Sequence, residues 1–90
     1  MNPRQFYEAR AKSIVKEVRE SKDISYKELA RRLDATGVTV DVQVLINRIN
    51  QGKFSFAFAL QLLAVMGVEH LEIPKQQVPF KAPGVKKLPG

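Results

Sequence analysis

Apolar side chains recur every three or four positions along most of the chain before residue 70, which is the spacing of one face of an α-helix. The first such stretch has Asn2 as a cap, Pro3 at the first helical position and Gln5 where a capping box needs its acceptor. It predicts a helix over residues 3–20. Its apolar stripe consists of Tyr7, Ala11, Ile14, Val15 and Val18.

A second helix is predicted over residues 26–33. Ser25 and Glu28 have the spacing of a capping box, in which the serine caps the helix and the glutamate reaches back to the serine amide. Leu29, Ala30 and Leu33 form its short apolar face. Residues 34–39 contain turn and cap formers and are expected to connect it to the next helix.

The third predicted helix is capped by Thr39 or Asp41 and ends at Gly52 as a left-handed cap. The β-branched residues of 38–46 are compatible with a strand, but the apolar rhythm favours a helix. Its buried face comprises Val42, Leu45, Ile46 and Ile49. The opposite face carries the amides Gln43, Asn47, Asn50 and Gln51, with Val44 and Arg48 beside them.

A fourth helix is predicted over residues 56–66, with Ser55 as its cap and Gly67-Val68 as a Schellman-type end. Gln61 is its only polar residue. A helix that is apolar all round must be enclosed on every side. We expect the small core to leave one face over for homodimerisation, although a fully intramolecular core is the alternative. The expected leftover residues are Phe54, Phe58, Leu62 and Val65.

Composition divides the chain into one domain, residues 1–73, and a tail, residues 74–90. The net charge is +6, but residues 73–90 hold four lysines and no acidic residue, so residues 1–72 carry only +2. Four of the five prolines also lie in this tail, which predicts an extended, mobile appendage. It is either merely solvated or an auxiliary phosphate-binding arm. Residues 70–73 are expected to form a short strand or strap.

Several classes of function are disfavoured by what the chain lacks. There is no cysteine, and His70 is the single histidine, so neither a thiolate site nor a metal cluster is expected. No phosphate-binding glycine loop or nucleophile elbow is present. We therefore predict no enzyme, no cofactor and no metal. Without a membrane-spanning run or a signal peptide, the default location is cytoplasmic.

Two segments carry a resemblance to a known family. Ser25-x-x-Glu28-Leu29-Ala30-x-x-Leu33 resembles the first helix of the lambda-repressor/Cro-like (XRE-type) helix-turn-helix, and residues 46–53, INRINQGK, resemble the end of its recognition helix. Residues 60–68 are similar to the helix that follows. The whole of residues 24–68 looks closest to an uncharacterised bacterial branch with this plan. The family's turn is tight, whereas residues 34–39 intervene here.

The resemblance implies an all-α, four-helix lambda-repressor-like helix-turn-helix domain with a short C-terminal extended segment and a Pro/Lys-rich tail. It also implies a small transcriptional regulator, a repressor by analogy, that binds double-stranded DNA. The expected partners are that duplex and a second copy of the chain. The expected base-reading residues are Gln43, Val44, Asn47, Arg48 and Gln51. Arg48 has the alternative of bridging to phosphate or to the fold. The expected phosphate contacts are Ser25, Tyr26, Lys27 and Lys53.

Two other interpretations stay open. Amides on a helix are often only solvated, and residues 24–56 hold few excess positive charges for a DNA reader. The second interpretation is a protein-interaction module (an antitoxin, an inhibitor or an adaptor) that keeps the fold but does not read DNA. The modest charge of the folded part and its abundant phenylalanine motivate it.

Overall fold

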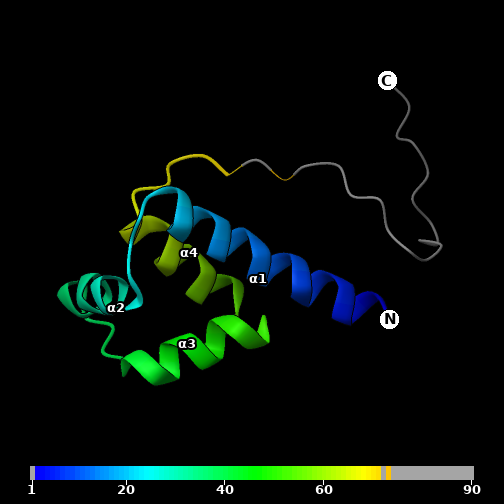
Figure 1. Cartoon of the computed structure of the whole chain (residues 1–90), viewed down its shortest axis with the longest axis horizontal. Coiled ribbons are helices and arrows are strands. Elements are labelled where there is room, and N and C mark those ends of the chain that lie inside the picture. Colours follow the sequence, from blue (N-terminus) through cyan, green and yellow to red (C-terminus); the bar gives the residue numbers. More distant parts are fainter. Residues whose placement is uncertain (1, 72, 74–90) are drawn as a thin grey trace.

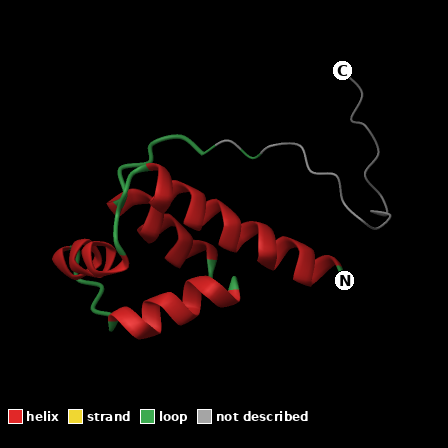
Figure 2. Cartoon of the chain, viewed as in Figure 1, coloured by secondary structure: helices red, strands yellow, loops and turns green. Residues whose placement is uncertain are grey.

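The computed structural model describes residues 2–71 and 73, and within them the secondary structure is entirely helical (Figures 1 and 2). The four helices are α1 (Pro3–Ser21), α2 (Tyr26–Ala35), α3 (Val42–Gln51) and α4 (Phe56–Val65). The expected all-α class is thus confirmed for the described residues. Residues 38–46, for which a strand was the alternative, form a loop and the start of α3.

Each half of the chain packs against the other half. α1 and α2 both contact α3 and α4, and Figure 1 shows α1 and α4 running side by side, with α2 at one end and α3 below. One apolar core lies between the helices. Its buried members are Val15, Ile24, Leu29, Ala30, Leu33, Leu45, Ile49, Phe58, Leu62, Leu63 and Met66.

The helices begin where their cap residues predict. Asn2 and Gln5 form a complete capping box, and Ser55 accepts a hydrogen bond from the Phe58 amide. For α3 the cap is Asp41 rather than Thr39, because the Asp41 carboxylate accepts from two amides of the first turn.

The capping box expected at α2 forms only in part. Ser25 Oγ accepts from the Glu28 amide over 3.0 Å. The Glu28 carboxylate, however, accepts hydrogen bonds from the Arg31 and Arg32 guanidinium groups. Two charged donors outcompete one backbone amide for that carboxylate.

Three helices end in the same Schellman arrangement, each with one residue in the left-handed region. That residue is Asp23 after α1, Gly37 after α2 and Gly67 after α4. The end of α4 follows the expectation to within one residue. α2 runs to Ala35, two residues further than expected, because the Gly37 amide bonds to Asp34 O and the Val38 amide to Leu33 O.

The connection between α2 and α3, residues 36–41, is held against the rest of the molecule. Val38 and Val40 are partly buried against the core, and the Thr39 hydroxyl donates to Asp34 Oδ1 over 2.9 Å. This connection is therefore stabilised by its own apolar contacts and a side-chain bond, and α3 is not left loosely attached.

The exposed face of α4 is not the expected one. Phe58 and Leu62 are only 4% and 0% exposed, and Phe54 and Val65 pack partly against the core. The prediction that these residues form a leftover face is wrong because Phe58 and Leu62 belong to the core and Phe54 and Val65 pack against it. Phe56 and Leu60, at 74% and 51% exposure, lie on the uncovered side instead.

Beyond α4 the chain forms no strand at residues 69–71 and 73, so the strap is the better of the two expectations there. Leu71 and Ile73 line a groove together with residues of α1 and α4. The predicted tail, residues 74–90, lies outside the described residues. In the described part of the chain, no helix is both long and apolar enough to cross a bilayer.

Candidate nucleic-acid interface

α3 is fixed from one side and at both ends. Leu45 and Ile49 are completely buried. The Asp41 carboxylate caps the first turn, and Gly52 ends the helix with φ +66° directly against the Glu8 carbonyl of α1. A helix held in this way presents its opposite face in a defined orientation.

The opposite face of α3 consists of uncharged, exposed side chains. Gln43, Asn47 and Gln51 are all exposed, and Val44 is 48% exposed. Gln43 Nε2 donates to Asn47 Oδ1 over 3.1 Å, one helical turn apart. The bond orients both amides and leaves the Gln43 oxygen and the Asn47 nitrogen free to pair with another molecule.

Arg48 contacts the fold as well as solvent. Its guanidinium lies over the Phe58 ring, with the Cζ atom 3.8 Å from the ring centroid. This cation–π contact joins α3 to α4. Of the roles expected for Arg48, the structure shows the bridge to the fold, and a guanidinium stacked on its face still has N–H donors at its edge.

The first turn of α2 contains three expected phosphate contacts. Ser25 Oγ is occupied as an acceptor by the cap bond, but its hydroxyl hydrogen remains available as a donor. Lys27 is exposed. Tyr26 is half-buried, and the Arg19 guanidinium lies 4.0 Å from its ring centroid. Lys53, the fourth expected contact, is exposed just after α3.

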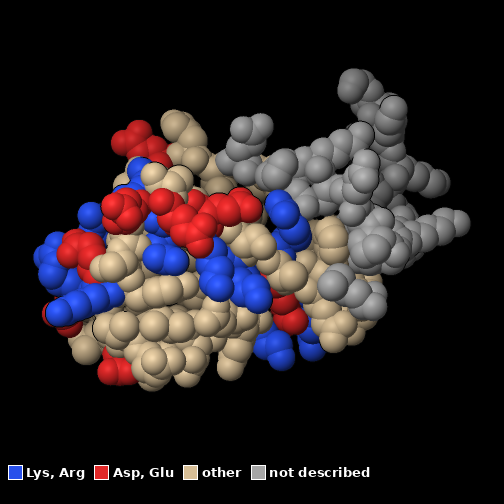
Figure 3. Space-filling view, viewed as in Figure 1, with Lys and Arg blue, Asp and Glu red and all other residues tan. Residues whose placement is uncertain are grey.

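The positive charge of α2 is largely paired within the helix. Arg31 Nη2 lies 2.6 Å from Glu28 Oε2, and Arg32 Nε lies 2.8 Å from the same oxygen. Hydrogen bonds from Arg31 and then Arg32 lower the pKa of Glu28 from 4.5 to about 2, and the same carboxylate raises the pKa of Arg31. Figure 3 shows basic and acidic groups intermixed over α1 and α2, with little charge over α3 in this view.

The structure therefore places the expected base-reading residues on one surface of α3, except that the Arg48 guanidinium stacks on Phe58 of α4. Sequence reasoning missed two contacts between helices: the Gly52–Glu8 approach, and the hydrogen bond of 3.1 Å from Arg32 Nη1 to Val65 O at the end of α4. In the sequence, the glycine at position 52 predicts a helix cap but not the approach to Glu8. Nothing in the sequence distinguishes Arg32 from its neighbour Arg31.

Over residues 2–71 and 73, His, Asp and Glu side chains form no group of three that could hold a metal ion. His70 is exposed on the loop after α4.

The comparisons place the chain in a family without assigning it a role. Residues 7–71 match the model of a family described as a domain of unknown function, DUF6471, and the chain belongs to that family. The matched segment begins within α1 and includes all of α2, α3 and α4. Neither a curated protein nor a solved structure matches the chain.

Proposed function

We propose that the chain binds double-stranded DNA as a small sequence-reading transcriptional regulator. α2 and α3 would act as a lambda-repressor-like helix-turn-helix, with α3 in the major groove. One observation carries the proposal: α3 is anchored by the completely buried Leu45 and Ile49 and turns exposed, hydrogen-bonded amides outward.

The side chains of this face suit the major groove. Asparagine and glutamine amides pair with adenine N6 and N7, which supports base-reading roles for Asn47, Gln43 and Gln51. The half-exposed Val44 offers an apolar surface to a thymine methyl group. Arg48, stacked on Phe58, would position α3 on α4 and direct its edge donors toward a guanine or a phosphate.

Affinity would come from the ends of the two helices. The amides at the start of α2, with the Ser25 hydroxyl and Lys27, form a site for one phosphate group. Tyr26 would add its hydroxyl there, and Lys53 would contact the backbone beyond the other end of α3. Because Glu28 pairs with both Arg31 and Arg32, we expect few strong phosphate contacts and a modest salt dependence.

The direct test is selection of bound sequences from a random duplex library, followed by affinity measurements across salt. The proposal predicts a recovered motif and a log K that falls by about 0.9 for each phosphate contact per log unit of salt. Binding without a motif would limit the protein to general DNA association. No binding at low salt would overturn the proposal.

A second candidate function rests on a different surface. Phe56, Leu60 and Ile73 are at least half exposed, which is unusual for neighbouring large apolar side chains. A protein-interaction module on the same fold would use this surface and not α3. Replacing Asn47 would then leave binding to the native partner intact, whereas replacing Leu60 would abolish it.

A further inference from the structure

We infer that α4 pairs with α4 of a second copy of this chain, in antiparallel orientation, with Leu60 on the two-fold axis. This goes beyond DNA binding and does not depend on it. The surface involved is the apolar groove of about 450 Å³ between α4 and the segment that follows it. Its lining residues are Phe56, Leu60, Leu63, Ala64, Val68, Glu69, Leu71 and Ile73.

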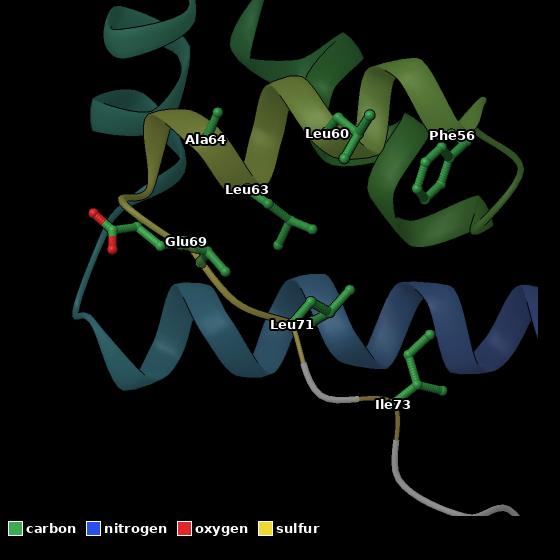
Figure 4. A pocket seen from close by; sticks show the side chains of 8 residues that line it. Phe56, Leu60, Leu63, Ala64, Glu69, Leu71 and Ile73 are labelled. Carbon is green, nitrogen blue, oxygen red and sulfur yellow. The ribbon is translucent and has the colours of Figure 1, made fainter.

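The groove has a regular apolar border on α4. Phe56, Leu60 and Ala64 follow each other at intervals of four residues, so they lie along one line of the helix. Figure 4 shows this line on α4, with the segment that carries Leu71 and Ile73 crossing α1 in this view. Among residues 2–71 and 73, Phe56 and Ile73 are the most exposed large apolar residues, at 74% and 73%.

The side chains along this line change from large to small, so the line fits a second copy of itself that runs in the opposite direction. Leu60 is midway between Phe56 and Ala64, and each interval of four residues spans about 6 Å of helix. When two copies pair antiparallel with Leu60 opposite Leu60, the large Phe56 of each copy meets the small Ala64 of the other. A two-fold interface needs this kind of self-complementarity.

The charges at the two ends of α4 are complementary in the same orientation. α4 itself contains no acidic or basic residue, so pairing brings no like charges together along the helix. Lys53 precedes its start and Glu69 follows its end, and both are exposed. Antiparallel pairing places Glu69 of one copy near Lys53 and the positive helix start of the other. Parallel pairing would oppose like charges instead.

Sedimentation of the full chain without DNA tests the pairing. Wild type is expected to show a concentration-dependent shift to twice the monomer mass. Leu60→Glu and Leu60→Lys, each alone, place like charges opposite each other on the axis and should raise the dimer Kd by more than about 100-fold. An equimolar mixture of the two should form a one-to-one heterodimer.

Val44→Glu is the matched control, because Val44 is exposed to a similar extent, 48%, but lies on α3. It should dimerise as wild type does. Circular dichroism checks whether the Leu60 variants fold. A second pair of variants tests the pairing even if they do not. Ala64→Phe should weaken the dimer because two phenylalanines then meet, and adding Phe56→Ala should restore it by exchanging large for small.

Each other outcome overturns the inference. A wild type that stays monomeric at all concentrations means that a different protein or another part of this chain covers the groove. A dimer insensitive to Leu60→Glu uses another surface. The antiparallel register is excluded if the mixture of Leu60→Glu and Leu60→Lys stays monomeric and if Phe56→Ala does not restore the dimer of Ala64→Phe. None of these outcomes bears on DNA binding, which the selection experiment tests separately.

Discussion

At the scale of single residues, Gly52 lets the end of α3 lie directly against the backbone of α1, because it has no side chain. Its backbone is left-handed, with φ +66°, and a Cβ at this position would overlap the Glu8 carbonyl oxygen. This close backbone approach thus adds to the burial of Leu45 and Ile49 in orienting the amide-bearing helix. Both properties require glycine, the conformation because other residues are strained there and the contact because any larger residue collides.

Gly52→Ala is expected to be markedly destabilising. Gly37→Ala is the matched control, since Gly37 also has a positive φ, +91°, but an added Cβ would meet nothing within 4 Å. We predict that Gly52→Ala lowers the free energy of unfolding in urea by about 1–3 kcal/mol more than Gly37→Ala, the typical effect of overpacking. Equal losses for the two variants would contradict a close contact between α3 and α1.

Glu28 predicts a pH dependence at the same scale. Hydrogen bonds from Arg31 and Arg32 lower its folded-state pKa from 4.5 to about 2. A lowered pKa stabilises the folded state above the unfolded-state pKa, and this contribution is lost as the pH falls from 4.5 toward 2. The melting temperature of wild type should therefore be higher than that of Glu28→Gln at neutral pH. The difference between the two melting temperatures should shrink as the pH falls from 4.5 toward 2. A difference in melting temperature that is constant with pH would argue against the ion pairs.

At the scale of elements, Arg32 links α2 to α4. Besides pairing with Glu28, its Nη1 donates to the Val65 carbonyl over 3.1 Å, at the negative end of α4. Arg31 pairs with the same glutamate but has no such bond to α4 among its hydrogen bonds. The two neighbouring arginines therefore separate the effect of the ion pair from that of the link between helices.

Arg32→Met is predicted to destabilise the fold by about 1 kcal/mol more than Arg31→Met, the usual net contribution of a hydrogen bond. Urea unfolding of the two variants measures the difference. If Arg31→Met costs as much as Arg32→Met, the bond to Val65 contributes nothing to stability and α4 is held by apolar packing alone.

The elements also show what sequence reasoning can reach. Cap residues and apolar spacing located the four helices because those signals act within a few residues. The exposed line of α4 escaped prediction because one polar residue, the exposed Gln61, is the only mark of the outward side in an otherwise apolar helix. Only the packing of the other helices decides that Phe58 and Leu62 are buried and that Phe56 and Leu60 are not.

The candidate interface divides in the same way. The spacing of apolar residues by three and four positions along α3 was sufficient to place Gln43, Val44 and Asn47 outward and Leu45 and Ile49 inward. The position of Arg48 over Phe58 could not be predicted, because it depends on how α4 crosses α3. The pairing of Glu28 with two arginines, in place of the Ser25 amide, follows from a local competition that the capping-box pattern does not express.

At the scale of the whole molecule, the proposed reading surface and the proposed pairing surface belong to different helices. The exposed amides lie on α3, whereas the exposed apolar line lies on α4. Pairing through α4 would relate two copies of α3 by a two-fold axis, and such dimers bind inverted repeats whose half-sites are about 34–36 Å apart. If both proposals hold, the selected DNA motif will be an inverted repeat, and Leu60→Glu will bind a half-site only weakly.

Lysine substitutions report on the backbone contacts at this scale. Lys27→Ala is expected to weaken binding to all duplexes alike and to reduce the slope of log K against log salt by about 0.9, the value for one phosphate contact. Lys12→Ala, on the partly exposed surface of α1, serves as the comparison. An unchanged slope for Lys27→Ala would remove the start of α2 from the interface.

The most direct test of base reading by α3 is the ratio of affinities for the selected duplex and a scrambled duplex. Asn47→Ala should reduce that ratio roughly 10- to 100-fold, the effect of losing one bidentate base contact, while Gln61→Ala, an exposed amide on α4, leaves it unchanged. A wild-type ratio near one, or an Asn47→Ala ratio equal to that of wild type, would contradict sequence reading by α3.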